Sequence, residues 1–145
     1  MCSILGIIDF DKKKQDKELE IKKINNLLKH RGPDDEGFYS DEYVSLAFNR
    51  LSILDLQKGN QPIKNNHIIS IFNGEIYNFK EIRKELEDSG FNFKTNSDSE
   101  IIPAAFLKWG IECISKFNGM FAISIYDLNE KKLYLIRDRV GIKPL

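Results

Sequence analysis

A cysteine at position two could act as a nucleophile that carries its own base. The chain begins MCSILGIIDF, so removal of Met1 would leave Cys2 with a thiol and a free α-amine on one residue. A free thiol is mostly protonated at neutral pH, although the thiolate is the nucleophilic form. An α-amine is partly unprotonated there and can accept the thiol proton, directly or through water. The alternative is that Cys2 is a small core residue at the start of a strand.

The segment NGEIYN could supply donors for a developing oxyanion. The Asn73 side-chain amide and the Gly74 backbone N–H are both donors, and they follow the apolar run HIISIF. Glycine also lets the backbone approach a ligand closely. The same Asn-Gly pair is a strong hairpin signal, so a purely structural turn is the alternative. Because the following residues are typical of a helix start, we expect the strand to end at Asn73-Gly74.

Two charged residues could bind the charged groups of an amino acid. Arg50 lies between the apolar stretches VSLAFN and LSILDL, and its guanidinium matches a carboxylate in a bidentate geometry. An internal salt bridge is the alternative for Arg50. Asp98 could bind an ammonium group, but Ser97 and Glu100 have capping-box spacing, so Asp98 could instead belong to a helix start. With Cys2 and Asn73-Gly74, these residues would suit a small α-amino acid with a reactive carbonyl, such as glutamine. The spacing alone leaves open whether the groups converge.

The pattern of apolar residues predicts the elements that must position these side chains. Strands are expected over 3–10 and 67–72, hairpins over 37–50 and 120–138, and helices over 16–30, over 78–90 and after 96–100. Strands that are apolar on both faces, combined with amphipathic helices, predict a layered α/β or α+β sandwich. Cys113 lies in an apolar helical context and is expected to be an inert core thiol. The basic segment RDRVGIKPL would ordinarily be a solvated strand end.

Composition excludes several classes of protein. The 145 residues fit one domain, and 22 Lys+Arg balance 22 Asp+Glu, which argues against a nucleic-acid or anionic-membrane surface. No apolar run approaches the ~20 residues that span a bilayer, and the N-terminus lacks the features of a secretory signal. Two cysteines fit a reducing compartment rather than a disulfide framework. We therefore expect a cytoplasmic protein without membrane or nucleic-acid partners.

Several motifs, taken together, resemble a known family across essentially all 145 residues. The chain is similar to the N-terminal glutaminase domain of asparagine synthetase, a class II glutamine amidotransferase. The motifs that carry the resemblance occur in the family order: MCSILG, RGPDDEG, NRLSILDL, NQP, NGEIYN, SDSE, FNGMFAISIYD and RDRVGIKPL. The resemblance implies an α+β fold, the four-layer αββα sandwich of N-terminal-nucleophile hydrolases, over a single domain 1–145 that is truncated at its C-terminal end.

The resemblance also implies a role for each candidate residue. Cys2 would attack the side-chain amide of glutamine, and Asn73 with the Gly74 N–H would hold the oxyanion. Ammonia would leave from a γ-glutamyl thioester, which water would hydrolyse to glutamate. Arg50 would bind the glutamine α-carboxylate and Asp98 its α-ammonium. The remaining residues expected to line the pocket are Leu51, Ser52, Ile53, Leu54 and Glu75.

The family pattern further predicts what this chain needs and what it lacks. No cofactor is expected for the chain itself, whereas ATP and Mg²⁺ would serve an ATP-dependent synthetase domain whose SGGxDS signature is absent from the sequence. The expected partners are glutamine, that synthetase domain or chain, and possibly a second copy in a homo-oligomer. A different interpretation is a non-catalytic glutamine-binding module or remnant that associates with a partner chain, because missing strands would leave an unpaired sheet edge.

Overall fold

Two antiparallel sheets form the centre of the molecule. The computed structural model describes residues 2–11, 16–52 and 60–145. The first sheet has the order β1-β3-β2, and the second has the order β4-β5-β6-β7. The strands are β1 (Ser3–Ile8), β2 (Asp35–Ser40), β3 (Val44–Arg50), β4 (Ile63–Asn65), β5 (Ile68–Ile76), β6 (Gly119–Asp127) and β7 (Lys132–Arg137).

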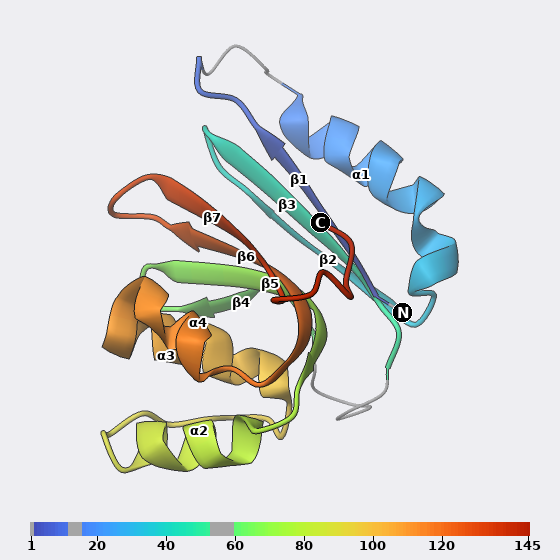
Figure 1. Cartoon of the computed structure of the whole chain (residues 1–145). Coiled ribbons are helices and arrows are strands. Elements are labelled where there is room, and N and C mark those ends of the chain that lie inside the picture. The colour runs from blue at the N-terminus through green and yellow to red at the C-terminus, as the bar shows by residue number, and fades with distance from the viewer. Residues whose placement is uncertain (1, 12–15, 53–59) are drawn as a thin grey trace.

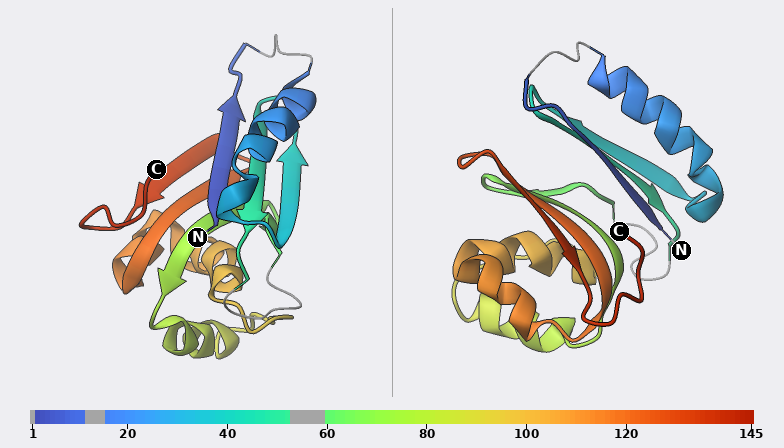
Figure 2. Two further views of the ribbon diagram at one scale, coloured as in Figure 1. Left: turned by 90° about the vertical axis from the view of Figure 1, so that its right-hand side faces the viewer. Right: turned by 45° about the horizontal axis from the view of Figure 1, so that its top comes forward.

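Helices cover the outer faces of both sheets, as Figures 1 and 2 show. Helix α1 lies on the first sheet, and α2, α3 and α4 lie on the second. The bounds are α1 (Lys17–Leu27), α2 (Phe79–Glu87), α3 (Ile101–Trp109) and α4 (Cys113–Lys116), with 3-10 turns at Lys29–Arg31, Asp98–Glu100 and Gly110–Glu112. The layers therefore follow the order helix, sheet, sheet, helix, which confirms the predicted αββα sandwich.

Strand β5 contributes to two separate cores. Successive side chains of a strand point to opposite faces. Ile68, Phe72 and Ile76 accordingly pack against the helices of the second sheet, whereas Ile69 and Ile71 pack against the first sheet. This double burial explains why the strand is apolar throughout, and it places Asn73 on the face that looks towards the first sheet.

The expected strand end at Asn73-Gly74 was wrong. β5 continues to Ile76 and pairs with β6 along its whole length. The glycine is needed for close strand contact, because a Cβ on Gly74 would lie 2.0 Å from the Met120 carbonyl oxygen. A Cβ on Gly119 would likewise lie 2.1 Å from the Glu75 carbonyl oxygen. Crowding between neighbouring strands, rather than a turn, accounts for the glycine of the Asn-Gly pair.

Helix α1 packs through a partly polar face. Ile21 is buried, but Leu19 and Leu27 are exposed although their spacing predicted an apolar face. Asn25 takes the inward position instead, and its side-chain amide exchanges hydrogen bonds with that of Asn49 on β3 at 2.9 Å. A mutual amide pair satisfies both buried groups, so polar residues here hold the helix to the sheet.

The turn before α3 differs from a capping box. The Ser97 side chain accepts a bond from the Ser99 N–H at 3.3 Å, as an N-cap does. Glu100 instead accepts from the backbone N–H groups of Lys94 and Thr95, each at 2.8 Å. The carboxylate therefore fixes the preceding loop and, with it, the position of Asp98. Cys113 is fully buried, as expected, and burial raises the pKa of its thiol to about 12.

Candidate active site

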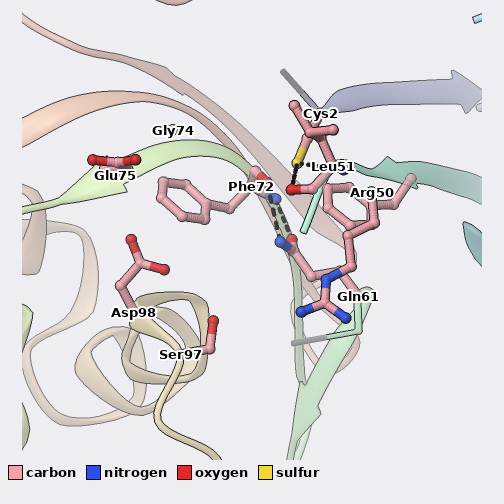
Figure 3. A pocket seen from close by; sticks show the side chains of 10 residues that line it. Cys2, Arg50, Leu51, Gln61, Phe72, Gly74, Glu75, Ser97 and Asp98 are labelled. Atoms are coloured by element: carbon pink, nitrogen blue, oxygen red, sulfur yellow. Dashed lines mark hydrogen bonds between the residues drawn. The ribbon is translucent and has the colours of Figure 1, made fainter. Parts of the chain in front are cut away.

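A pocket at one end of the sandwich brings most of the predicted residues together (Figure 3). It lies where β1 begins and β3 ends, beside β5 and the Asp98–Glu100 turn. Its lining residues are Cys2, Phe48, Arg50, Leu51, Gln61, Phe72, Gly74, Glu75, Ser97 and Asp98. Groups that are distant in the sequence therefore converge on one space.

The start of β1 positions Cys2. The Cys2 sulfur accepts a hydrogen bond from the Leu51 N–H at 3.3 Å and lies 3.6 Å from the Leu51 carbonyl oxygen. The next residue, Ser3, pairs with Asn49 in the sheet and accepts a 3.0 Å bond from its side chain. The buried Asn25–Asn49 pair thereby anchors the chain immediately after the thiol.

The RGPDDEG segment holds two parts of the pocket wall. The Arg31 Nε and Nη2 atoms both lie 3.5 Å from the Cys2 carbonyl oxygen, to which they donate. Gly32 lies directly on β3, since a Cβ there would be 2.5 Å from the Asn49 carbonyl. The Asp34 carboxylate accepts a bond from the Ser52 N–H at 2.7 Å. The motif therefore fixes both the Cys2 main chain and the segment after Arg50.

The two predicted oxyanion donors are neighbours on β5, but only one of them lines the pocket. Gly74 lines the pocket. Asn73 is buried, at 4% exposure, on the β5 face that looks towards the sheet carrying Cys2. Asn73 is absent from the described residues that line the pocket, so the structure brings Gly74, but not the Asn73 side chain, to its wall.

Arg50 is a buried cation in the pocket wall. It ends β3, is 5% exposed, and donates from Nη1 to the Asn60 side-chain oxygen at 2.9 Å. This bond to Asn60 orients the guanidinium in the pocket wall. A fork-shaped cation in this setting can bind a carboxylate with two parallel hydrogen bonds.

Asp98 and Glu75 give the opposite wall an acidic character (Figure 3). Asp98 is 5% exposed and accepts a bond from the Ile76 N–H at 3.0 Å. Burial raises the pKa of Asp98, and the nearby charge of Glu75 raises it further. A carboxylate with a raised pKa gains from a cation placed beside it. The pocket thus pairs a cationic side at Arg50 with an anionic side at Asp98 and Glu75.

Other predicted site residues fall outside the pocket lining. Ser52 follows Leu51 but uses its N–H for Asp34. Ile53 and Leu54 lie outside the described residues. The pocket also contains residues to which sequence reasoning assigned no role, above all Gln61. The NQP motif was the available signal for Gln61, but a glutamine in a loop has no pattern that reveals its partner.

The described residues offer no metal site and no membrane helix. Among them, no group of three or more His, Cys, Asp or Glu side chains is placed to hold a metal ion. Within the same ranges, none of the helices is both long enough and apolar enough to span a bilayer.

Comparison with known families gives this geometry a context. The sequence profile described as "Glutamine amidotransferase domain" matches residues 1–145. The chain belongs to the glutamine amidotransferase domain family. This membership agrees with the family that the sequence motifs resemble.

Individual relatives are similar to this amidotransferase domain over all or nearly all of its length. It is 44% identical to asparagine synthetase [glutamine-hydrolyzing] 1 of Bacillus subtilis, over 100% of the chain and 24% of that protein. It is 41% identical to asparagine synthetase B [glutamine-hydrolyzing] of Escherichia coli, over 100% of the chain and 26% of that protein. The chain therefore spans about a quarter of the length of these relatives.

A solved structure supports the fold. The glutamine phosphoribosylpyrophosphate amidotransferase of B. subtilis matches with a TM-score of 0.56 at 22% identity, covering 69% of this chain and 24% of that one. At this identity the likeness shows a shared fold and no more.

Proposed function

We propose that the chain is a glutaminase domain that hydrolyses glutamine to glutamate and ammonia through a thioester on Cys2. The observation that carries this proposal is the convergence of Cys2, Arg50, Gly74 and Asp98 on one pocket. Glutamine has a carboxylate, an ammonium and a reactive amide, which match the cationic, anionic and nucleophilic parts of this pocket. Membership of the family supports the same reaction.

Each step has a residue to carry it. Arg50 binds the α-carboxylate, and Asp98 with Glu75 binds the α-ammonium, so the side-chain amide points towards Cys2. The α-amine of the processed terminus takes the thiol proton, and the sulfur attacks the amide carbon. The Gly74 N–H and the Asn73 amide, once turned into the pocket, stabilise the oxyanion. The proton passes to the leaving amine, ammonia departs, and water cleaves the thioester to release glutamate and the thiol. Leu51 completes the wall beside the thiol.

We further propose that the ammonia passes to an ATP-dependent synthetase domain or chain of the asparagine synthetase type. The similarity to relatives with that name supports this partner. The glutaminase reaction itself needs no cofactor, because thiol, amine and backbone donors supply its chemistry; ATP and Mg²⁺ belong to the synthetase reaction. We place the reaction in the cytoplasm, and a homo-oligomer is compatible with it.

Covalent labelling tests the proposal directly. An electrophilic glutamine analogue should add one adduct to the processed chain, and peptide mapping should place that adduct on Cys2. Cys113 is the internal control, because it is fully buried and its thiol has a pKa of about 12. Cys2→Ala should remove the adduct, and Cys113→Ala should keep it. Saturable glutamine binding without any adduct on Cys2 would favour the non-catalytic binding module.

A further inference from the structure

Gln61 makes two hydrogen bonds to the backbone of β5 at the edge of the pocket. The Phe72 N–H donates to Gln61 Oε1 at 2.6 Å, and Gln61 Nε2 donates to the Phe72 carbonyl oxygen at 3.1 Å (Figure 3). The side chain is buried, at 8% exposure. None of the steps proposed above uses this amide, although Gln61 lines the same pocket as Cys2.

The amide continues the sheet where β4 has ended. β4 pairs with β5 only as far as Ile63 opposite Ser70, and the same register places Gln61 opposite Phe72. The Gln61 side chain therefore donates and accepts as a strand residue would, directly before the oxyanion donors Asn73 and Gly74.

The main chain of Gln61 lies against the other sheet. A Cβ on Gly37 of β2 would be 1.8 Å from the Gln61 carbonyl oxygen, so the two segments are in close contact. Gly37 pairs with Phe48 of β3, which itself lines the pocket. One residue thus contacts the sheet that carries Cys2 through its backbone and the strand of the oxyanion donors through its side chain.

We propose that Gln61 is a positioning residue that sets the oxyanion donors of β5 against the Cys2 thiol. The inference rests on the proposed glutaminase function and deepens it. Oxyanion donors stabilise charge that develops only in the transition state, so their displacement lowers kcat more than it weakens substrate binding. Arg50 and Asp98, which would bind the substrate, make hydrogen bonds to Asn60 and to the Ile76 N–H rather than to the Gln61 side chain.

Two substitutions at Gln61 distinguish a role in positioning the oxyanion donors from a role in packing alone. Gln61→Met keeps the length of the side chain but removes both hydrogen bonds; it should lower kcat by ~10-fold or more, while KM changes less than ~3-fold. Gln61→Glu keeps an acceptor for the Phe72 N–H, loses the donor and adds negative charge near the oxyanion. It should therefore reduce kcat further than Gln61→Met.

Asn78 offers a matched control elsewhere in the fold. Its side chain also bonds two backbone groups, donating to the Lys116 carbonyl oxygen and accepting from the Asn118 N–H, each at 2.9 Å. Asn78→Leu should lower the midpoint of thermal unfolding about as much as Gln61→Met does, yet leave kcat within ~2-fold of the unmodified chain.

The experiment is steady-state glutamate release from glutamine by the full processed chain, with thermal unfolding measured on each variant. A fall in kcat confined to the Gln61 variants, with KM nearly constant, is the expected result. Unchanged kcat in Gln61→Met, or an equal fall in Asn78→Leu, would overturn the positioning role while leaving the glutaminase intact. A chain that is inactive without any substitution would overturn the proposed function, and the inference with it.

Discussion

Asp98 shows how a residue that we propose to bind the substrate ammonium can lower the stability of the fold that holds it. Its carboxylate is buried and lies near Glu75, and both burial and that neighbouring charge raise its pKa. The backbone N–H of Ile76 compensates only part of this cost. A substrate ammonium would supply the missing counter-charge, so the unfavourable site is suited to a cationic group.

We expect Asp98→Asn to weaken glutamine binding without destabilising the chain. Asparagine keeps an oxygen for the Ile76 N–H but removes the charge. The KM for glutamine should rise by about 10- to 100-fold, the range for losing a hydrogen bond to a charged group. Steady-state kinetics would measure this, and an unchanged KM would contradict the assigned role.

The pH dependence of stability follows from the same carboxyl. A raised pKa means that the folded chain binds this proton more tightly than the unfolded chain, whose value is near the ordinary 3.8. The Asp98 contribution to stability therefore falls as pH rises from there through the folded pKa. At neutral pH, Asp98→Asn should be at least as stable as the unmodified chain, and this advantage should shrink in acid. Thermal unfolding from pH 4 to 8 measures the difference.

At the scale of single residues, the sequence indicated which side chains could take part in chemistry better than it indicated which residues each side chain contacts. Cys2, Arg50 and Asp98 were identifiable because a thiol, an isolated arginine and an aspartate each suggest a limited set of ligands. Asn25 and Gln61 were not, because an amide reveals neither its burial nor its partner without the fold. Asn73 was identified by type, but its side chain is not among the described pocket lining.

Strands β5 and β6 approach each other closely beside the pocket. Gly74 and Gly119 remove side chains from positions where a Cβ would collide with backbone atoms of the opposite strand. This approach places the Gly74 N–H on a strand that pairs with β6 as far as Ile76, rather than on a free turn. The pairing of β5 with β6 therefore fixes the position of the Gly74 N–H, the proposed oxyanion donor, more firmly than a loop would.

Gly74→Ala should damage both stability and turnover. The new Cβ would meet the Met120 carbonyl oxygen at 2.0 Å, so the backbone must shift. We expect a loss of ~2 kcal/mol or more in the free energy of unfolding and a kcat lower by at least ~10-fold. Gly6→Ala on β1 is the matched control: its Cβ would lie 3.5 Å from a Leu46 methyl, an ordinary contact, and should cost less than ~0.5 kcal/mol. Denaturant unfolding and kinetics of both variants decide the matter; equal effects would refute the crowding argument.

The segment RDRVGIKPL is largely solvated at the end of β7, as expected, although Asp138 and Lys143 within it are buried. Asp138 accepts bonds from the N–H groups of Ile142 at 2.8 Å and Lys143 at 3.0 Å. Although burial acts in the opposite direction, these and other backbone donors lower the pKa of Asp138 to about 2. The hydrogen bonds of this one carboxylate therefore organise a loop that is otherwise largely exposed, which the charge of the segment did not reveal.

At the scale of the whole molecule, the apolar pattern of the sequence predicted a layered sandwich of sheets and helices. The location of the pocket depends instead on which strands pair with one another. Apolar residues on both faces of the strands were enough to predict sheets covered by helices, because such strands cannot face water. The spacing did not reveal that the start of β1, the end of β3 and the middle of β5 meet at one end. The three segments come together because of the order of the strands in each sheet and because glycines allow close contact between neighbouring strands. A local sequence pattern reveals neither.

The central claim is that Cys2 acts as nucleophile and base once it becomes the first residue. An N-terminal extension turns its α-amine into an amide, which has no useful basicity, and leaves every other pocket residue unchanged. The most direct measurement is glutamate release from glutamine by one preparation, before and after proteolytic removal of an extension that ends at Met1, with the terminus checked by mass spectrometry. The account predicts no release before cleavage and steady release once Cys2 is exposed. Equal release from a chain shown to retain its extension would contradict it.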